Sequence, residues 1–227
     1  MTADANMAQT AALIGDPGRA NMLAALLGGE ALTATELAAI AGVSRPAASE
    51  HLSKLTQGRL LTVTSAGRHR HYRLASAEVA RVLEALMTVA AGQDPGRRAT
   101  PRIDPALRNA RTCYDHVAGR LGVALADALV RCKAIILTPD AGEVTGVGLD
   151  LLDSLGILLE TSRRSKRLLC RPCLDWSERR PHIAGALGAA LYRHMFALGW
   201  IEREKGRAIT VTPAGRRGLA GAFGLDF

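Results

Sequence analysis

The sequence contains few aromatic residues and no long apolar run. Tryptophan, tyrosine and phenylalanine make up only 4% of the 227 residues, so its helices must pack largely through small aliphatic side chains. No apolar stretch approaches the roughly 20 residues that a transmembrane helix needs. The N-terminal residues MTADANMAQT also lack the basic and apolar regions of a signal peptide. We therefore expect a mainly helical protein that is located in the cytoplasm and has no membrane partner.

The sequence also lacks the motifs that accompany most enzyme active sites. It has no phosphate-binding glycine pattern, no cofactor fingerprint and no oxyanion loop beside a nucleophile. Cys113 with His116, or Cys173 with His182, could in principle form a nucleophile and its base. Without an accompanying motif this pairing defines no reaction, so we predict that the protein is not an enzyme.

Positive charge is concentrated in one part of the first half. The formal net charge is +8 at pH 7, yet residues 1–95 carry equal numbers of basic and acidic side chains. Within residues 42–73, six basic side chains stand against a single acidic one. A local excess of this kind favours contact with the phosphates of nucleic acid.

The same region has the pattern of a helix-turn-helix. The capping box TATE begins a helix that is predicted to turn Leu37 and Ile40 inward, and a short turn at residues 42–44 ends it. A second helix over residues 45–57 then has a small polar outer face. This geometry is typical of a motif that enters the major groove of DNA.

A predicted β-hairpin follows the second helix. The strand-like runs LLTVT and HYRL flank SAGRHR, whose glycine and cations form the tip. Such a tip can follow the phosphates or reach into the minor groove.

These features together resemble the ArsR/SmtB family of winged-helix regulators. The resemblance covers roughly residues 10–91 and rests on GDPGRANMLAALL and on TELAAIAGVSRPAASEHLSKLTQGRLLTVTSAGRHRHYRL, in that order. It implies a recognition helix over residues 45–57, a wing over residues 60–74 and a dimer helix over residues 76–91. Members of the family bind operator DNA as homodimers and usually release it when an effector binds.

The predicted contacts with double-stranded DNA lie on the recognition helix and the wing. Arg45, Ser49 and His51 would read base edges, and Ala47 would meet a thymine methyl group. The wing tip would hold the backbone or the minor groove. The complete predicted set is Ser44, Arg45, Ala47, Ser49, His51, Lys54, Arg68, His69 and Arg70.

Neither effector site of the metal-sensing relatives can exist in this region. The helix before the recognition helix, TATELAAIAG, has no cysteine, and VARVLEALMTVAAG on the predicted dimer helix has no metal ligand. Any sensing must therefore use the second half of the chain, a C-terminal extension.

A repeat organises that second half. HVAGRLGVAL at residues 116–125 returns as HIAGALGAAL at residues 182–191. Before the first copy, GQDPGRRATPRID at residues 92–104 has the composition of a linker. We predict a winged helix-turn-helix and dimerisation domain over residues 1–95, a linker over residues 96–104 and a sensor domain over residues 105–227.

The predicted fold class is mainly α with small β-hairpin wings. The C-terminal domain is expected to consist of two helix-and-wing units, each running helix, strand, Thr-Pro turn, helix. The segment PALRNARTCYDHVAG is predicted to form the first of these helices, with Cys113 and His116 as neighbours one turn apart. Cys132 is expected to lie in the core.

Cysteine and histidine recur at equivalent places in the two copies. If the copies pack about a pseudo-twofold axis, these places face each other and can bind zinc or a thiophilic metalloid such as As(III). The predicted ligands are Cys113, His116, Cys170, Cys173 and His182. Two alternatives stay open, since CRPC in a basic environment also suits a thiol switch, and the same residues can serve packing alone.

The leading hypothesis is a homodimeric transcriptional repressor on an inverted-repeat operator. A metal, a metalloid or a thiol-reactive compound sensed in the C-terminal domain would release it from DNA. The alternative is an effector-independent DNA-binding protein whose C-terminal domain serves only oligomerisation.

Overall fold

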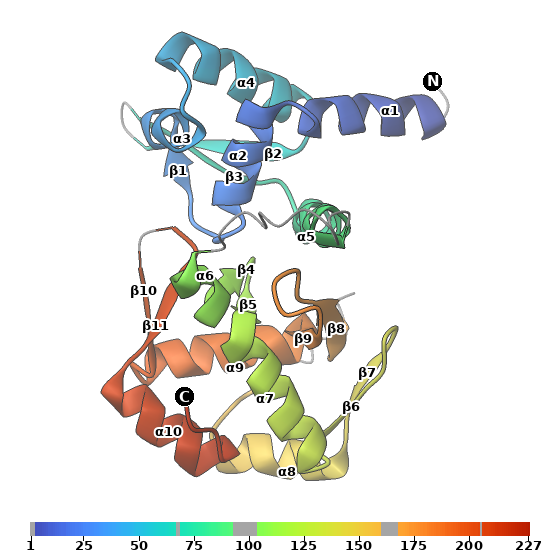
Figure 1. Cartoon of the computed structure of the whole chain (residues 1–227), viewed down its shortest axis with the longest axis vertical. Coiled ribbons are helices and arrows are strands. Elements are labelled where there is room, and N and C mark those ends of the chain that lie inside the picture. The colour runs from blue at the N-terminus through green and yellow to red at the C-terminus, as the bar shows by residue number, and fades with distance from the viewer. Residues whose placement is uncertain (1–2, 67–68, 93–103, 160–167, 205) are drawn as a thin grey trace. The chain divides into compact units, whose positions relative to one another are not determined.

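The computed structural model describes residues 3–66, 69–92, 104–159, 168–204 and 206–227. The predicted linker lies outside these residues except for Asp104, and Arg68 of the predicted wing tip lies outside them as well. The chain divides into two compact units, residues 1–84 and 85–227 (Figure 1). Both consist of helices and small antiparallel hairpins, which confirms the predicted fold class.

The first unit is a winged helix-turn-helix. Its wing is a hairpin of β2 and β3, and β1 pairs with the other edge of β3, so the strand order is β1-β3-β2. The elements are α1 (Ala3–Ile14), α2 (Pro17–Leu26), β1 (Leu32–Thr33), α3 (Ala34–Ala41), α4 (Arg45–Gln57), β2 (Leu61–Ala66), β3 (His69–Leu74) and α5 (Ala77–Gly92), which crosses the boundary between the units.

Local signals in the sequence fix the ends of these helices. Thr33 and Glu36 form the expected capping box of α3, and Gly42 ends that helix in a left-handed conformation with φ of 66°. The Ser44 hydroxyl then accepts a hydrogen bond from the backbone N–H of Ala47 at the start of α4. The turn between α3 and α4 is therefore closed by a cap on each side.

The prediction that Ile40 points inward is wrong. Its side chain is 50% exposed, while Leu37 and Ala38 are buried. The inner face of α3 is centred between its two buried residues, Leu37 and Ala38. Ile40 lies beyond the edge of that face.

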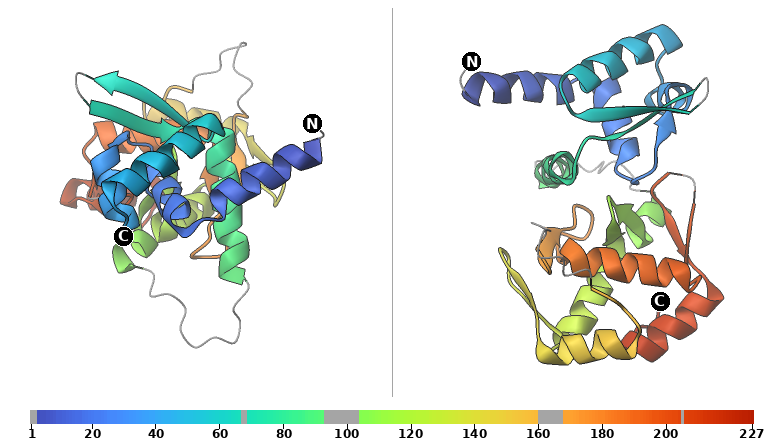
Figure 2. Two further views of the ribbon diagram at one scale, coloured as in Figure 1. Left: turned by 90° about the horizontal axis from the view of Figure 1, so that it is seen from above. Right: turned by 180° about the vertical axis from the view of Figure 1, so that it is seen from behind.

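The second unit contains the same succession of elements twice: hairpin, helix, wing, helix. The two wings project on opposite sides of the unit (Figures 1 and 2). After α6 (Pro105–Asn109), the first copy is β4 (Arg111–Cys113), β5 (His116–Ala118), α7 (Gly119–Arg131), β6 (Ile135–Leu137), β7 (Gly142–Val144) and α8 (Gly146–Ser154). The second copy is β8 (Arg171–Leu174), β9 (Pro181–Ala184), α9 (Gly185–Ala197), β10 (Ile201–Arg203), β11 (Ile209–Val211) and α10 (Pro213–Phe223).

The two copies pack against each other about a pseudo-twofold axis, and their contact is made by the first helix of each copy, α7 and α9. Helix α7 lies against β9 of the other copy, and α9 lies against β5. A small apolar cavity lies where they meet, and apart from Met195 its lining consists of equivalent residues from the two copies. These pairs are Val117 and Ile183, Gly122 and Gly188, and Leu125 and Leu191.

The predicted helix over PALRNARTCYDHVAG is wrong beyond Asn109. Ala110 is extended, with φ of −150° and ψ of 136°, and residues 111–118 form the hairpin of β4 and β5. Tyr114 makes the tight turn with φ of 61°. Cys113 and His116 are therefore partners across a hairpin, not neighbours on a helix, and the repeated histidines lie in strands that precede the repeated helices.

Two smaller expectations are also wrong. Thr138 closes the tip of the first wing by hydrogen bonds with Ala141, so it is not equivalent to Thr212. The equivalent of Thr212 is Thr145, since each caps the last helix of its copy. Cys132, expected in the core, is exposed because it is the C-cap residue of α7.

Among the described residues, no helix is long and apolar enough to cross a membrane.

Candidate functional site

The outer face of α4 displays the predicted base-reading residues. Ala48, Leu52 and Leu55 fix the inner face of the helix because they are fully buried. Arg45 and Ser49 are exposed, and Ala47 is half-buried. The helix therefore presents a small polar surface of the size that a major groove accepts.

Three other predicted DNA contacts have partners within the first unit. Ser44 caps α4 through its hydroxyl. His51 is half-buried, with Nε2 3.9 Å from Oδ1 of Asp16, and Lys54 pairs with Glu50 at 2.6 Å. Contact with DNA would thus compete with an existing interaction at His51 and Lys54.

The wing carries Arg70 as an exposed cation. Arg70 lies opposite Ser65 in the antiparallel pairing of β2 and β3, and His69 lies opposite Ala66. A cation in this position can reach a phosphate beside the groove that α4 would occupy.

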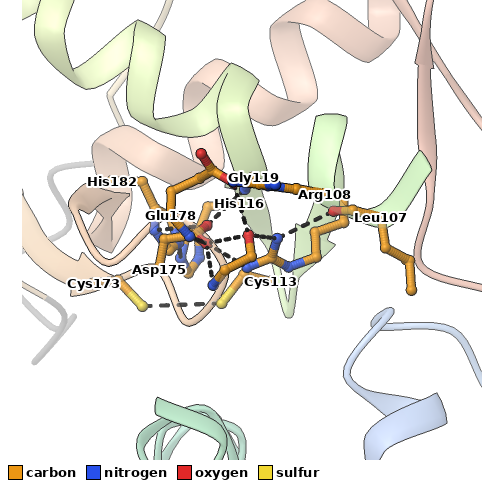
Figure 3. A network of polar contacts seen from close by, with 11 residues as sticks. Leu107, Arg108, Cys113, His116, Gly119, Cys173, Asp175, Glu178 and His182 are labelled. Atoms are coloured by element: carbon orange, nitrogen blue, oxygen red, sulfur yellow. Dashed lines mark hydrogen bonds and ion pairs between the residues drawn. The ribbon is translucent and has the colours of Figure 1, made fainter. Parts of the chain in front are cut away.

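In the second unit, two hairpins bring two cysteines and two histidines together. Cys113 pairs with His116 across β4 and β5, and Cys173 pairs with His182 across β8 and β9. The four ligand atoms all lie within 4.8 Å of one another. The histidine Nε2 atoms are 3.1 Å apart and the two sulfur atoms are 4.0 Å apart. Figure 3 shows the four side chains together. We refer to these four side chains as the Cys/His group.

A carboxylate lies near the Nδ1 atom of each histidine, on the side of the ring away from the other histidine. Nδ1 of His116 is 3.3 Å from Oδ1 of Asp115, and Nδ1 of His182 is 3.7 Å from Oδ2 of Asp175. Because a carboxylate can only accept a hydrogen bond, this placement favours the hydrogen on Nδ1. Nδ1 of His182 has no hydrogen-bond partner at its distance of 3.7 Å. Both Nε2 atoms are directed at the centre of the group.

Asp175 is the best-anchored member of this surrounding shell. Its side chain and that of Arg111 are fully buried and form an ion pair at 2.9 Å. The backbone N–H of Gly119, at the start of α7, donates to Oδ2 of Asp175 at 2.7 Å. Burial alone would raise the pKa of Asp175, but the Arg111 guanidinium, the charge of His182 and the Gly119 N–H hold that pKa well below its ordinary value of 3.8.

The second hairpin loop encloses Arg111. The Trp176 ring lies against the guanidinium, with Cζ 4.5 Å from the ring centroid, and Arg111 also donates to Ser177 and to the carbonyl of Leu107. At the edge of this network, Arg108 pairs with Glu178 at 2.9 Å (Figure 3). Arg111 from the first copy is thus bound by the loop of the second.

The electrostatics favour ionised donors within the Cys/His group. A hydrogen bond from Cys113 lowers the pKa of the Cys173 thiol, and burial raises it. Hydrogen bonds from His116 and His182 lower it further, so that this pKa lies far below its ordinary value. Burial lowers the pKa of His116, but hydrogen bonds to Asp115 and Cys173 and the thiolate charge raise it to about 9. Without a metal ion, the group therefore favours an imidazolium beside a thiolate.

Glycine makes room for each histidine. A Cβ atom on Gly122 would lie 3.4 Å from Cβ of His182, and one on Gly188 would lie 3.1 Å from Cβ of His116. In both cases the nearest atom would be a backbone carbonyl oxygen, of Val117 at 2.4 Å and of Ile183 at 2.3 Å. Each first helix can therefore approach the hairpins only through a residue without a side chain.

Cys170, the fifth predicted ligand, does not belong to this group. It is packed in a hydrophobic cluster of the second unit, and its backbone forms a bridge with Gly142. Burial raises the pKa of its thiol to about 11, the opposite of the effect on Cys173. Its surroundings are those of a core cysteine.

The sequence alone draws no attention to Asp115 and Arg111, whereas Asp175, with Trp176 and Glu178, is a candidate to position an arginine or a ligand. A signal was present, because RTCYD and RPCLD repeat an arginine, a cysteine and an aspartate before the histidine of each copy. The second phrase is followed by six additional residues, WSERRP, before His182. Because of that insertion, the two cysteines are 60 positions apart while the two histidines are 66 positions apart, so the repeat does not align both pairs.

Comparisons with known proteins bear on both units. A helix-turn-helix domain profile matches residues 14–64. The uncharacterized HTH-type transcriptional regulator YdfF of Bacillus subtilis (strain 168) is 41% identical over 212 residues, which make up 93% of this chain and 94% of that protein.

Three solved structures also match part of the chain. Reduced HlyU from Vibrio cholerae N16961 is 27% identical and covers 38% of this chain and 90% of its own, with a TM-score of 0.35. NolR from Sinorhizobium fredii is 28% identical, with coverages of 38% and 85% and a TM-score of 0.36. The homodimeric winged helix-turn-helix DNA-binding domain of Mb0332 from Mycobacterium bovis, a possible ArsR-family regulator, is 26% identical, with coverages of 38% and 79% and a TM-score of 0.35.

Proposed function

Since the chain belongs to the family of HTH-type transcriptional regulators, with an ArsR-type winged helix that binds DNA, we propose that it is a homodimeric repressor controlled from its C-terminal domain. Two recognition helices would occupy successive major grooves of an inverted repeat, about 34 Å apart. An effector bound at the Cys/His group would change the distance and orientation between the two recognition helices of the dimer, so that the protein releases the operator.

The proposed DNA contacts are those of α4 and the wing. Arg45, Ser49 and Ala47 are accessible on the outer face of α4 and would read bases, while Arg70 would bind a phosphate. His51 and Lys54 would contribute only by leaving Asp16 and Glu50. Ser44, His69 and Arg68 complete the proposed surface.

An apolar stripe on α5 supports the proposed dimer. Val82, Leu86 and Val89 follow one another at helical spacing and are each between 45% and 57% exposed. Side chains of this kind at i, i+4 and i+7 are suited to packing against a second copy of the helix. The helix thus matches the dimerisation role that the family resemblance implies.

The single observation that carries the proposed sensing is the convergence of four ligand atoms within 4.8 Å. A zinc ion or a metalloid such as As(III) would bind the sulfur and nitrogen donors, and an electrophile or oxidant would react with the thiolate. Because both copies contribute to the group, either event would act on the packing of the whole domain. This route is independent of the winged helix, which lacks both effector sites of the metal-sensing relatives.

Operator affinity of the reduced protein tests this function. We expect Zn²⁺, arsenite or a thiol-reactive compound to weaken binding at least about tenfold, within the usual range of allosteric coupling. Fluorescence anisotropy with a duplex selected from genomic fragments measures the affinity. Cys113→Ser should abolish the response, whereas the matched control Cys132→Ser, at an exposed cysteine outside the group, should retain it. An unchanged affinity with every effector, despite full thiol reactivity, would favour the constitutive DNA-binding protein instead.

A further inference from the structure

We infer that Cys113, His116, Cys173 and His182 bind one divalent cation of the zinc class in tetrahedral geometry, and that this ion joins the two copies of the C-terminal domain. The inference deepens the proposed function, because the same four residues form the proposed sensor. It concerns which ligand the group takes and what that ligand does to the domain. Its test requires no DNA.

Two of the six separations within the group are close to the edges of one tetrahedron. With bonds of about 2.0 to 2.1 Å to nitrogen and about 2.3 Å to sulfur, a tetrahedral zinc site separates its two nitrogens by about 3.3 Å and its two sulfurs by about 3.8 Å. The Nε2 atoms of His116 and His182 are 3.1 Å apart, and the sulfur atoms of Cys113 and Cys173 are 4.0 Å apart. The nitrogen pair and the sulfur pair therefore each fit one ion with shifts of a few tenths of an ångström. All six separations lie within 4.8 Å, and the nitrogen–sulfur edges of a zinc site are about 3.5 Å.

The placement of the imidazoles suits a cation between them. Nδ1 of His116 is 3.3 Å from Asp115, and Nδ1 of His182 is 3.7 Å from Asp175 and has no hydrogen-bond partner. With the hydrogen of each neutral ring on Nδ1, each Nε2 directs a lone pair at the other. Two lone pairs at this separation repel unless a proton or a cation lies between them. A metal ion satisfies both, and it also accepts the two sulfur donors, which one proton cannot do.

Charge balance favours a divalent ion. Two thiolates and two neutral imidazoles carry a charge of −2, so a divalent cation gives a neutral centre. Cys113, His116 and His182 are buried, and a buried site tolerates net charge poorly. A monovalent soft ion would leave one negative charge, and As(III) would lack the third thiolate of its preferred trigonal site because Cys170 lies outside the group.

The carboxylates act as positioning residues for the ligands. A histidine that binds a metal usually donates its other ring N–H to a carboxylate, which fixes its orientation and its tautomer. Asp175 is itself fixed by the buried guanidinium of Arg111 and by the N–H of Gly119. The shell therefore connects the ligand His182 of the second copy to the first turn of α7 in the first copy.

The ion would act as a link between the copies. Each hairpin contributes one cysteine and one histidine, so neither copy has the four donors of a structural zinc site by itself. Removing the ion would break a connection at the pseudo-twofold axis. The C-terminal domain should therefore lose stability when the metal is removed.

Metal binding by the full-length, reduced protein tests the inference. We expect one Zn²⁺ per chain by elemental analysis, and a fall in the melting temperature when a strong chelator removes it. Replacement by Co²⁺ should give the intense visible absorption of tetrahedral cobalt and a thiolate-to-metal charge-transfer band. Cys113→Ser should lower Zn²⁺ affinity by at least about 100-fold, whereas Cys170→Ser, at an equally buried cysteine, should leave it within about twofold.

Asp175 is tested by its own variant. Asp175→Asn should weaken Zn²⁺ binding about 10- to 100-fold while keeping the tetrahedral cobalt spectrum, as a positioning residue does. The matched control is Asp127→Asn, which removes a surface partner of Arg180 and should change neither affinity nor spectrum. Because the wild-type stoichiometry and spectrum are read first, the result does not depend on the folding of a variant.

The inference and the proposed function fail in different ways. Absence of stoichiometric Zn²⁺, an octahedral cobalt spectrum, or an equal effect of Cys170→Ser would overturn the zinc centre. Tetrahedral Zn²⁺ whose removal leaves operator affinity unchanged would uphold the centre and contradict the sensing. An operator response to arsenite in protein that binds no Zn²⁺ would contradict the centre and uphold the sensing.

Discussion

Nε2 of His116 and Nε2 of His182 lie 3.1 Å apart inside the C-terminal domain, although the residues are 66 positions apart in the sequence. Each ring comes from a different hairpin, and each is followed by a helix that begins with a left-handed glycine, Gly119 or Gly185. The duplicated sequence thus forms a polar centre that neither copy has by itself. The stability of the domain should depend on the groups that hold this centre in place.

The ion pair of Asp175 and Arg111 should be the most sensitive of these groups. Since both side chains are fully buried, Asp175→Asn leaves the guanidinium without its charge partner and should cost about 3 to 5 kcal/mol in free energy of unfolding. Urea unfolding at neutral pH, followed by circular dichroism, measures the loss. Asp127→Asn removes an exposed pair with Arg180 and should cost no more than about 1 kcal/mol; equal losses would show that burial of the pair does not matter.

The same residue should make stability depend on acid. The pKa of Asp175 in the folded protein lies below the ordinary value of 3.8, so the unfolded chain takes up the proton first as the pH falls. The stabilisation is therefore complete above about pH 4 and decreases below it. Comparing wild type with Asp175→Asn between pH 6 and pH 2.5 should show a difference in free energy of unfolding that shrinks only at the acid end. A constant difference would contradict the assignment.

Two helix glycines should respond in opposite ways to alanine. A Cβ on Gly188 would lie 2.3 Å from the carbonyl oxygen of Ile183, whereas a Cβ on Gly221 would meet nothing within 4 Å. We expect Gly188→Ala to lower the free energy of unfolding by about 1 to 3 kcal/mol through overpacking. Gly221→Ala should raise it by up to about 1 kcal/mol through better helix propensity. Thermal unfolding measures both, and stabilisation by Gly188→Ala would contradict the close approach of α9.

The winged helix could be predicted because its signals are local. The capping box of Thr33 and Glu36 and the cap at Ser44 act within one helical turn, and the structure contains both as predicted. The hairpin at residues 111–118 could not be predicted in this way, since its apolar residues also fit a helical stripe. Its turn depends on Tyr114 in a left-handed conformation, which is rare for a residue of that size.

The Cys/His group shows a second limit of sequence patterns. The Cys-x-x-Cys spacing drew attention to Cys170, but strand pairing places Cys173 opposite His182 and Cys113 opposite His116. The cysteines are 60 positions apart and the histidines are 66 positions apart. A fixed repeat period cannot align both. Only the longer loop of the second hairpin reconciles the two spacings, and that loop is fixed by tertiary contacts of Trp176 and Asp175 with Arg111.

The proposed dimerisation through α5 should be lost when the apolar stripe of that helix receives a charge. Leu86→Glu places a carboxylate between the exposed side chains of Val82 and Val89. In a symmetric dimer, two such carboxylates would face each other across the interface. We expect a monomer at micromolar concentration by sedimentation, together with much weaker operator binding. Ile40→Glu changes an equally exposed apolar side chain on α3 and should leave the dimer intact. A dimeric Leu86→Glu protein would place the interface elsewhere.

The proposed difference in DNA contacts, with α4 reading bases and the wing binding phosphate, should appear in how operator affinity depends on DNA sequence and on salt. Arg70→Ala should weaken binding to operator and unrelated duplexes alike and reduce the slope of log affinity against log salt by about 1, because one phosphate contact is lost. Ser49→Ala should instead reduce the preference for the operator by about 1 to 3 kcal/mol at one base pair and leave the salt slope unchanged. Anisotropy titrations at several salt concentrations separate these effects, with Ser154→Ala on α8 as the matched control. A uniform loss from Ser49→Ala would instead assign its hydroxyl to a phosphate and leave the reading of bases to Arg45 and Ala47.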